Sequence, residues 1–195
     1  MICYNRLSLT NTSMAIIKVH DKYFEPYLSE ETIQHKVKEL AELINKDYEG
    51  RRPLFIAILN GSFMFAADLF KHLSLDVEIS FIKLASYKGT RSTGHVITSI
   101  GLDTDITGRD IIIVEDIIDT GKTLHNFLPQ LINQQPASIK IAILLHKPSA
   151  TVYPVDIQYC CFSIPDKFVV GYGLDYDGHG RNLKEIYQLK ERGQF

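Results

Sequence analysis

The segment Ile111 to Thr123, with the sequence IIIVEDIIDTGKT, constrains the fold of this chain more than any other. Its first four residues are apolar and rich in β-branched side chains, which predicts a fully buried strand ending at Val114. Two carboxylates, Glu115 and Asp116, follow at the carboxyl end of that strand, and a short loop then leads into an apolar-periodic segment typical of a helix. Open α/β sheets bind ligands at the carboxyl ends of their strands, and a helix start binds anions. The segment therefore offers a phosphate cradle beside two acids that suit a divalent metal or ribose hydroxyls.

The end of this segment, Gly121-Lys122-Thr123, also matches the end of the phosphate loop of nucleoside triphosphatases. That loop has the pattern G-x-x-x-x-G-K-[ST], which requires a glycine at position 116. The residue at this position is Asp116, whose carboxylate would narrow the loop and repel a triphosphate. The pattern therefore disfavours a nucleoside triphosphatase.

Strand and helix patterns alternate along the rest of the chain. Ser29 followed by Glu30 and Glu31 predicts a helix start, and apolar residues then recur at helical spacing as far as Ile44. The other expected elements are strands at residues 54–59, 77–85, 139–145, 155–162 and 168–172 and helices at residues 63–73 and 124–132. Such alternation predicts an α/β fold with an open parallel sheet flanked by helices.

Two features depart from this regular pattern. Residues 86–101 are polar and rich in Ser, Thr and Gly, which predicts a long loop of the kind that is usually functional. Pro129 lies inside an expected helix, where proline removes a hydrogen bond and clashes one turn back. We therefore expect a kink or an early end of that helix.

Composition narrows the class of protein. The 195 residues suit one domain with a sizeable core, and the net charge of −2 argues against a nucleic-acid-binding surface. The sequence contains no apolar run as long as a membrane span. Adjacent Cys160 and Cys161 lie in an expected strand, so they should face opposite sides and not form a disulfide. We expect a cytoplasmic protein with reduced thiols.

Five segments together resemble the type I phosphoribosyltransferases, which use phosphoribosyl pyrophosphate (PRPP). Val114 to Thr123 resembles their PRPP motif, and its doubled isoleucine between the acids is similar to the hypoxanthine–guanine branch. The other segments occur in matching order: Leu59-Asn60-Gly61-Ser62, Ser86-Tyr87, Lys147, and Pro165-Asp166-Lys167-Phe168-Val169-Val170-Gly171-Tyr172 with Asp175 and Arg181 behind it. The resemblance extends from about Ile17 to about Leu189.

The resemblance implies one domain over residues 14–195. Its sheet core would lie at about residues 30–150, and a small hood would come from residues 14–28 and about 155–195. Residues 1–13 would be a disordered tail, or would precede a true start at Met14.

The implied activity belongs to purine salvage. The family transfers the 5-phosphoribosyl group of PRPP to N9 of hypoxanthine, and the resemblance extends this to guanine, with Mg²⁺ as cofactor. The implied partners are therefore PRPP and a 6-oxopurine, in a homodimer or homotetramer, without nucleic acid or membrane. Two alternatives remain open: a transferase that prefers xanthine, and a non-catalytic regulator that binds PRPP or a nucleotide.

The PRPP motif supplies most of the implied site. Glu115 and Asp116 would bind the ribose hydroxyls and Mg²⁺. The 5′-phosphate would lie against Asp119, Thr120, Gly121, Lys122 and Thr123. Asp119 is the candidate catalytic residue, which would accept the proton of purine N7, although aspartate is also a favoured helix N-cap.

The pyrophosphate site is implied at Leu59, Asn60, Gly61 and Arg181. In the family this loop contains a strained non-proline peptide bond, and a lysine often fills the position of Asn60. That departure removes a positive charge but leaves the backbone donors. Arg181 could bind pyrophosphate through two N–H groups, or could be an ordinary surface charge.

The remaining implied residues close the site and select the base. Ser86 and Tyr87 would begin a lid that excludes water from the reacting centre. Lys147 would donate to the 6-oxo group of hypoxanthine or guanine and so reject adenine. The other implied residues are Phe168, which would stack on the ring, Val169, whose backbone would read its edge, and Asp175, which would hold a second Mg²⁺.

Overall fold

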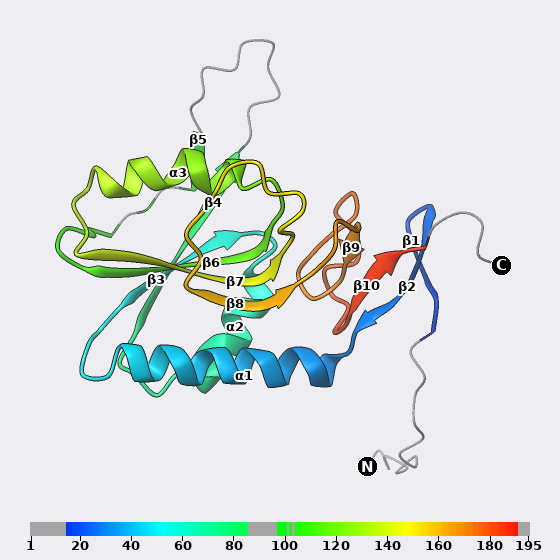
Figure 1. The fold of residues 1–195 in the computed structure, drawn as a ribbon, viewed down its shortest axis with the longest axis horizontal. Helices are drawn as coiled ribbons and strands as arrows, with labels where there is room; N and C mark the ends of the chain where they lie inside the picture. The colour runs from blue at the N-terminus through cyan, green and yellow to red at the C-terminus, as the bar shows by residue number, and fades with distance from the viewer. Residues whose placement is uncertain (1–14, 86–96, 101, 103, 191–195) are drawn as a thin grey trace, which may run out of the picture.

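The structure is a computed structural model that describes residues 15–85, 97–100, 102 and 104–190. These residues form two sheets of different size together with three helices (Figure 1). The lid residues Ser86 and Tyr87 lie outside the described residues, as does the tail at residues 1–13.

The larger sheet confirms the predicted α/β fold. Its strand order is β5-β4-β3-β6-β7-β8. The parallel strands are β3 (Leu54–Leu59), β4 (Glu78–Ala85), β6 (Asp110–Ile118), β7 (Ser138–His146) and β8 (Tyr159–Ser163). The edge strand β5 (Ile97–Ile100) pairs antiparallel with β4. β5 falls inside the stretch predicted as loop, so that prediction is wrong for residues 97–100, which gain backbone partners from β4.

Helices cover both faces of this sheet (Figure 1). α1 (Glu30–Asp47) and α2 (Phe63–His72) pack on one face, and α3 (Lys122–Ile132) packs on the other. Alternation along β6 supplies both cores, because Ile112 and Val114 join the α1 side while Ile111 and Ile113 join the α3 side. The strand is therefore apolar on both faces, which explains its uninterrupted apolar run.

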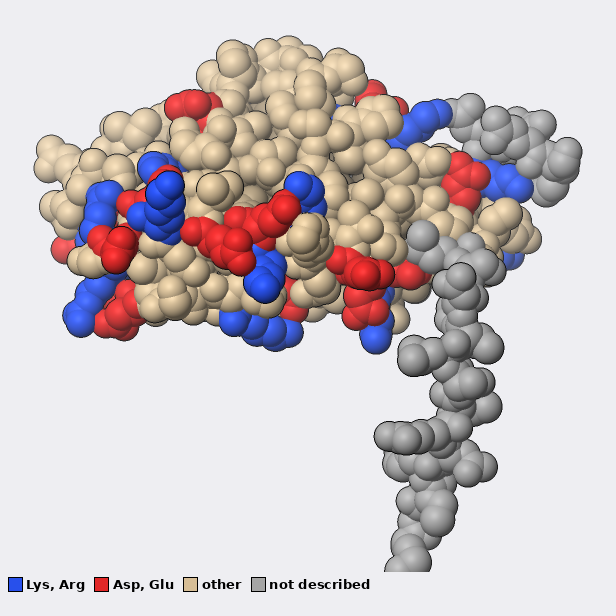
Figure 2. Space-filling view, turned by 60° about the horizontal axis from the view of Figure 1, so that its bottom comes forward, with Lys and Arg blue, Asp and Glu red and all other residues tan. Residues whose placement is uncertain are grey.

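α1 begins where the sequence predicts. The Ser29 hydroxyl accepts a hydrogen bond from the backbone N–H of Thr32 at 3.2 Å, and Glu30 and Glu31 occupy the first turn. Its buried face is made of Ile33, Val37, Leu40, Ala41 and Ile44. On the α1 side of the molecule, Lys and Arg are intermixed with Asp and Glu (Figure 2), and some are paired, as in the Lys36–Glu39 ion pair.

The smaller sheet forms the hood. It has the order β1-β2-β10-β9 and contains β1 (Ile17–Val19), β2 (Lys22–Leu28), β10 (Ile186–Leu189) and β9 (Val169–Val170), all antiparallel. Val19, Phe24, Val170 and Tyr187 form its own core. The N-terminal segment and the end of the chain therefore build the hood together. However, β8 belongs to the larger sheet, so the C-terminal part of the hood begins later than the expected residue 155.

β6 is longer than the predicted strand. It continues to Ile118, so Glu115 and Asp116 lie within the strand and not beyond its end. The reason is that its two neighbours end at different heights. β7 keeps pairing with β6 as far as Ile118↔His146, whereas the pairing with β3 stops at Ala57↔Val114. The two acids therefore lie within the part of β6 that pairs with β7, but beyond the part that pairs with β3.

Two predicted strands are shorter than expected. Residues 155–158 are not strand, because the Gln158 side-chain oxygen accepts the Ile141 N–H at 2.9 Å in place of a paired backbone carbonyl. The predicted strand at 168–172 is reduced to Val169–Val170, because Gly171 and Tyr172 turn the chain with φ of 107° and 49°.

Pro129 does not end α3 immediately. The helix continues to Ile132, and the Asn133 N–H donates to the Pro129 carbonyl at 3.1 Å. The expected early end is therefore wrong, because the helix includes the three residues that follow the proline.

The two adjacent thiols behave as predicted, because Cys160 is exposed, Cys161 is buried and both are free. Among the described residues, no helix is both long enough and apolar enough to cross a membrane.

Candidate active site

The carboxyl end of β6 and the start of α3 enclose a hollow of about 270 Å³. It is lined by residues 115–121, Thr123 and Leu124. Gly121 occupies the N-cap position of α3 with φ of 80°, a conformation that favours glycine. Asp119 is therefore not the N-cap, and its side chain is half exposed beside the hollow. The backbone N–H groups at the start of α3 are placed to bind an anion.

A neighbouring segment supports the loop between β6 and α3. The backbone N–H groups of Val152 and Tyr153 both donate to the Thr120 carbonyl, at 3.1 and 2.9 Å. A Cβ atom on Gly121 would lie 2.2 Å from the Tyr153 carbonyl oxygen. The loop therefore needs glycine at this position for its close approach as well as for its φ angle.

Thr151 joins the loop between β6 and α3 to the turn that follows β7. Its hydroxyl lies 3.0 Å from the Asp119 carbonyl oxygen and 3.0 Å from the Lys147 carbonyl oxygen. The third neighbour is His146 Nε2, at 3.2 Å. One hydroxyl therefore ties together the backbones that carry Asp119 and Lys147.

Replacing Thr151 by valine should lower the free energy of unfolding by about 1 kcal/mol, because both carbonyls lose a shared donor. Urea denaturation of the wild type and the variant measures this change. Thr151→Ser keeps the hydroxyl and is the matched control. A valine variant as stable as the serine variant would contradict the role of the hydroxyl.

The two acids of the PRPP motif have different surroundings. Glu115 is buried, and its Oε2 atom has no hydrogen-bond partner among the described residues. Burial, together with the charge of Asp116, raises the pKa of Glu115 well above its usual value. Burial also raises the pKa of Asp116 to about 6, although its Oδ1 accepts the Ile117 N–H at 2.9 Å. A cation bound here would favour the ionised form of both groups.

This donor set fits Mg²⁺. The described part of the chain contains no cluster of three or more His, Cys, Asp or Glu side chains placed to hold a metal. Mg²⁺ does not require one, because it usually keeps several waters and takes one or two carboxylates plus substrate phosphates. The unpartnered Glu115 oxygen and the neighbouring Asp116 carboxylate meet that requirement.

The β3–α2 loop lies directly against Asp116. A Cβ atom on Gly61 would lie 1.6 Å from Asp116 Oδ2, so a side chain there would overlap the carboxylate. The Leu59–Asn60 peptide bond is cis, at the position where the resemblance implies an unusual bond. On the hood side, a Cβ atom on Gly173 would lie 2.1 Å from the Gly61 carbonyl oxygen. The loop is thus enclosed between Asp116 and a glycine of the hood.

Arg181 is held on the same turn of the hood. Its Nη1 donates to the Gly173 carbonyl at 2.7 Å, and its Nη2 lies 2.6 Å from Asp175 Oδ1. The second oxygen of Asp175 accepts the Gly178 N–H at 2.7 Å. Asp175 therefore serves as the counter-ion of Arg181, and its role with a second Mg²⁺ stays a prediction.

Lys147, the first of the residues expected to recognise the base, contacts Asp119. The Lys147 ammonium is 3.1 Å from Asp119 Oδ2 and 3.1 Å from Asp166 Oδ1, and only 7% of its side chain is exposed. Phe168 is 44% exposed, and its ring packs edge-on against Tyr176 with centroids 5.8 Å apart. Val169 is buried in β9. An exposed aromatic face held by a neighbouring ring is suited to stacking on a planar ligand.

Three residues that the sequence reading did not single out lie in this site. Asp166 belongs to a segment already recognised, yet nothing in the sequence pairs it with Lys147, 19 positions away. Thr151 and Gly173 lie against backbone carbonyls of distant segments, and such contacts leave no pattern in the sequence. Only the repeated small residues around position 173 hinted at a close approach.

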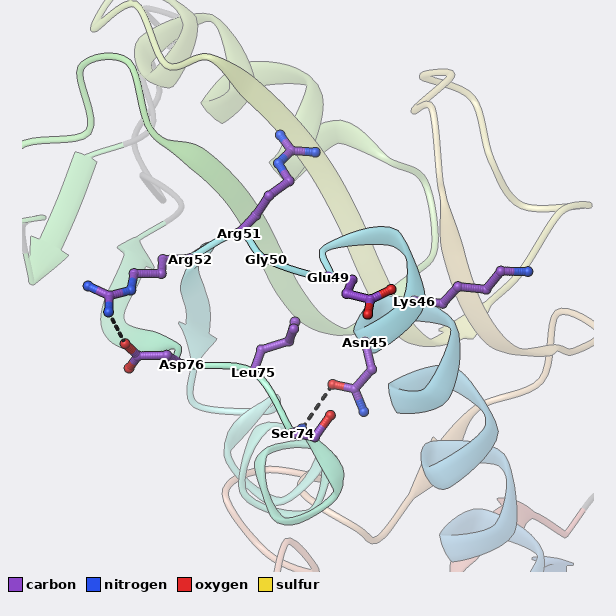
Figure 3. Close-up of a pocket in the computed structure, with 9 residues that line it drawn as sticks. All are labelled: Asn45, Lys46, Glu49, Gly50, Arg51, Arg52, Ser74, Leu75 and Asp76. Carbon is purple, nitrogen blue, oxygen red and sulfur yellow. Dashed lines mark hydrogen bonds and ion pairs between the residues drawn. The ribbon is translucent and has the colours of Figure 1, made fainter.

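A larger hollow of about 650 Å³ lies at the amino ends of β3 and β4 (Figure 3). Three of its charged side chains are already paired, since Arg52 lies 2.8 Å from Asp76 and Arg51 forms an ion pair with Asp110. Because ligands of open α/β sheets bind at the carboxyl ends of the strands, the smaller hollow is the better candidate.

Comparison with known proteins identifies the family of this chain. The model of the phosphoribosyl transferase domain matches residues 26–177. The chain belongs to the phosphoribosyltransferase family. A hypoxanthine-guanine phosphoribosyltransferase of Lactococcus lactis is 46% identical to this phosphoribosyltransferase over 172 residues, which are 87% of this chain and 93% of the relative.

Solved phosphoribosyltransferases also share its fold. A crystal structure of a hypoxanthine-guanine phosphoribosyltransferase from Bacillus anthracis superposes with a TM-score of 0.80 at 43% identity, covering 86% of this chain and 97% of that one. A hypoxanthine phosphoribosyltransferase from Staphylococcus aureus gives 0.81 at 41% identity, covering 85% and 91%. This phosphoribosyltransferase therefore has the family's parallel sheet flanked by helices.

Proposed function

We propose that this phosphoribosyltransferase acts in purine salvage, transferring the 5-phosphoribosyl group of PRPP to N9 of hypoxanthine, and of guanine, with release of pyrophosphate. The observation that carries the proposal is the Lys147–Asp119 pair, whose charged atoms are 3.1 Å apart beside the phosphate hollow. A 6-oxopurine presents its 6-oxo acceptor next to N7 on one edge. The ammonium can donate to the former while the carboxylate takes the proton of the latter.

The same pair supplies specificity for the base. The 6-amino group of adenine is a donor and would face an ammonium, which is also only a donor. Such a mismatch leaves two polar groups unsatisfied in a buried position, and Lys147 is buried. Hypoxanthine and guanine share the 6-oxo group, so Lys147 accepts both. Phe168 would stack on the ring of either base.

Around the reacting carbon, this chain's residues fix the substrate and manage charge. Attack by the base passes through an oxocarbenium-like state, as in other glycosyl chemistry. The backbone N–H groups at the start of α3 hold the 5′-phosphate, with the Thr120 and Thr123 hydroxyls as added donors. Arg181 and the backbone of the loop at Leu59, Asn60 and Gly61 bind the pyrophosphate group. Asp119 accepts the N7 proton as the bond to N9 forms.

We further propose that Glu115 and Asp116 bind the ribose hydroxyls and hold Mg²⁺, with Asp175 as ligand of a second ion. The buried, unpartnered Glu115 oxygen supports this assignment. When bound, the metal supplies positive charge to the departing pyrophosphate. A bound cation would counteract the burial that raises the pKa of Asp116, because a nearby positive charge favours the ionised carboxylate.

Ultraviolet monitoring of nucleotide formation tests the function. The purified protein is supplied with PRPP and Mg²⁺ and, in parallel, hypoxanthine, guanine, xanthine or adenine. We expect hypoxanthine and guanine to be converted and adenine to be inert. If xanthine were converted faster than hypoxanthine and guanine, the proposed substrate preference would be wrong. Absence of turnover with every base, together with calorimetric binding of PRPP, would replace the enzyme by a non-catalytic regulator.

The cytoplasmic location and the homodimer or homotetramer remain predictions. Light scattering coupled to size-exclusion chromatography measures the oligomeric state directly, and a monomer would contradict it.

A further inference from the structure

Asp166 lies on the loop between β8 of the larger sheet and β9 of the hood. Its Oδ1 atom is 3.1 Å from the Lys147 ammonium, the same distance as Asp119 Oδ2. The Asp166 side chain is 61% exposed, whereas the Lys147 side chain is 7% exposed. The ammonium therefore sits in a buried position and is held between two carboxylates that come from different parts of the chain.

The three N–H donors of the Lys147 ammonium allow it to bind both carboxylates and a ligand. Lys147 has three N–H donors, of which Asp119 and Asp166 each engage one, and the third is left for a ligand. A buried charge is costly without a partner of opposite sign. When Asp119 takes the proton of purine N7 it becomes neutral, so Lys147 would lose one of its two counter-ions in that step. Asp166 would then be the remaining one.

We propose that Asp166 is a positioning residue for base recognition, which anchors the Lys147 ammonium toward the 6-oxo group and thereby leaves Asp119 free to handle the N7 proton. This inference rests on the proposed function of the Lys147–Asp119 pair. In this arrangement Asp166 acts through Lys147 and not on the substrate itself. Its position on the loop that leads into β9 also places Lys147 relative to Phe168, since both side chains are then fixed by the same short segment.

Steady-state kinetics of Asp166→Asn test the proposal. We expect the KM for hypoxanthine to rise about tenfold, the loss expected for one hydrogen bond to a charged group. The KM for PRPP should stay at the wild-type value, because the phosphate hollow is not touched. Asp166→Glu should retain most of the affinity for hypoxanthine. Asp156→Asn removes the same charge at an exposed position away from the site and should match the wild type.

A double-mutant cycle distinguishes positioning from a merely structural role. In a Lys147→Met background, Asp166→Asn should have no further effect on the KM for hypoxanthine, because the two residues act as one unit. Additive effects, or a parallel rise in the KM for PRPP, would overturn the proposal. An unchanged KM for hypoxanthine in Asp166→Asn would overturn it as well.

A binding measurement separates this inference from the proposed catalysis. By calorimetry, the wild type should bind inosine monophosphate more tightly than adenosine monophosphate, and Asp166→Asn should reduce that preference. If no base is turned over but the preference falls in the variant, the enzyme proposal fails and Asp166 keeps its role. If turnover is normal and the preference is unchanged in the variant, only the role of Asp166 fails.

Discussion

Asp119→Asn should lower kcat for hypoxanthine by about 10²- to 10⁴-fold, the contribution usual for a positioned general base. The asparagine amide is close in shape to the carboxylate, and its oxygen can still accept a hydrogen bond from Lys147, 3.1 Å away in the wild type. The variant therefore removes the ability to take the N7 proton while keeping the geometry. PRPP affinity should remain close to the wild-type value, since the cradle is made by the backbone of the loop.

Single-turnover kinetics and PRPP titration measure these two quantities separately. The matched control is Asp76→Asn, which removes a carboxylate at the amino ends of the strands, where Asp76 pairs with Arg52 (Figure 3). That variant should keep full activity. Unchanged turnover in Asp119→Asn would remove Asp119 from the chemistry, and a large loss of PRPP affinity would make it a binding residue instead.

Gly61→Ala should lower kcat/KM for PRPP by about 10²-fold, the order expected when a reacting group is displaced by about 1 Å. The added Cβ would lie 1.6 Å from Asp116 Oδ2 and 2.3 Å from Asp116 Cγ, so either the loop or the carboxylate must move. Both belong to the region proposed for pyrophosphate and Mg²⁺. The apparent affinity for Mg²⁺, measured by titrating the metal at fixed PRPP, should weaken in the same variant.

Gly108→Ala is the control for adding a methyl group to a glycine. Gly108 has φ of 67° and open space where its Cβ would lie, so the substitution should cost about 1 kcal/mol of stability through the backbone alone. Its activity should be that of the wild type. A Gly61→Ala enzyme with wild-type kcat/KM would show that the contact with Asp116 does not matter for catalysis.

The sequence by itself determined the class of fold and the central element of the site. A strand such as β6 is apolar on both faces and must be covered on both, and the helices between the strands provide that cover. Local signals such as the N-cap residue Ser29 determine where a helix begins. The turn from β6 into α3 was also predictable, because its glycine, hydroxyls and acids are contiguous in the chain. The family followed from the motifs, and the comparisons confirm it.

Only the tertiary structure decided which residues act together. The pairing of β6 with β3 stops at Val114, whereas its pairing with β7 continues to Ile118. Glu115 and Asp116 therefore lie within a strand and also line the hollow. The contacts of Gly61 with Asp116 and of Asp166 with Lys147 join segments that are far apart in the chain. Such contacts arise from packing between elements and leave no periodicity or spacing in the sequence. The sequence therefore specifies the chemical groups of each segment. The packing of the strand ends against the hood determines the distances between those groups.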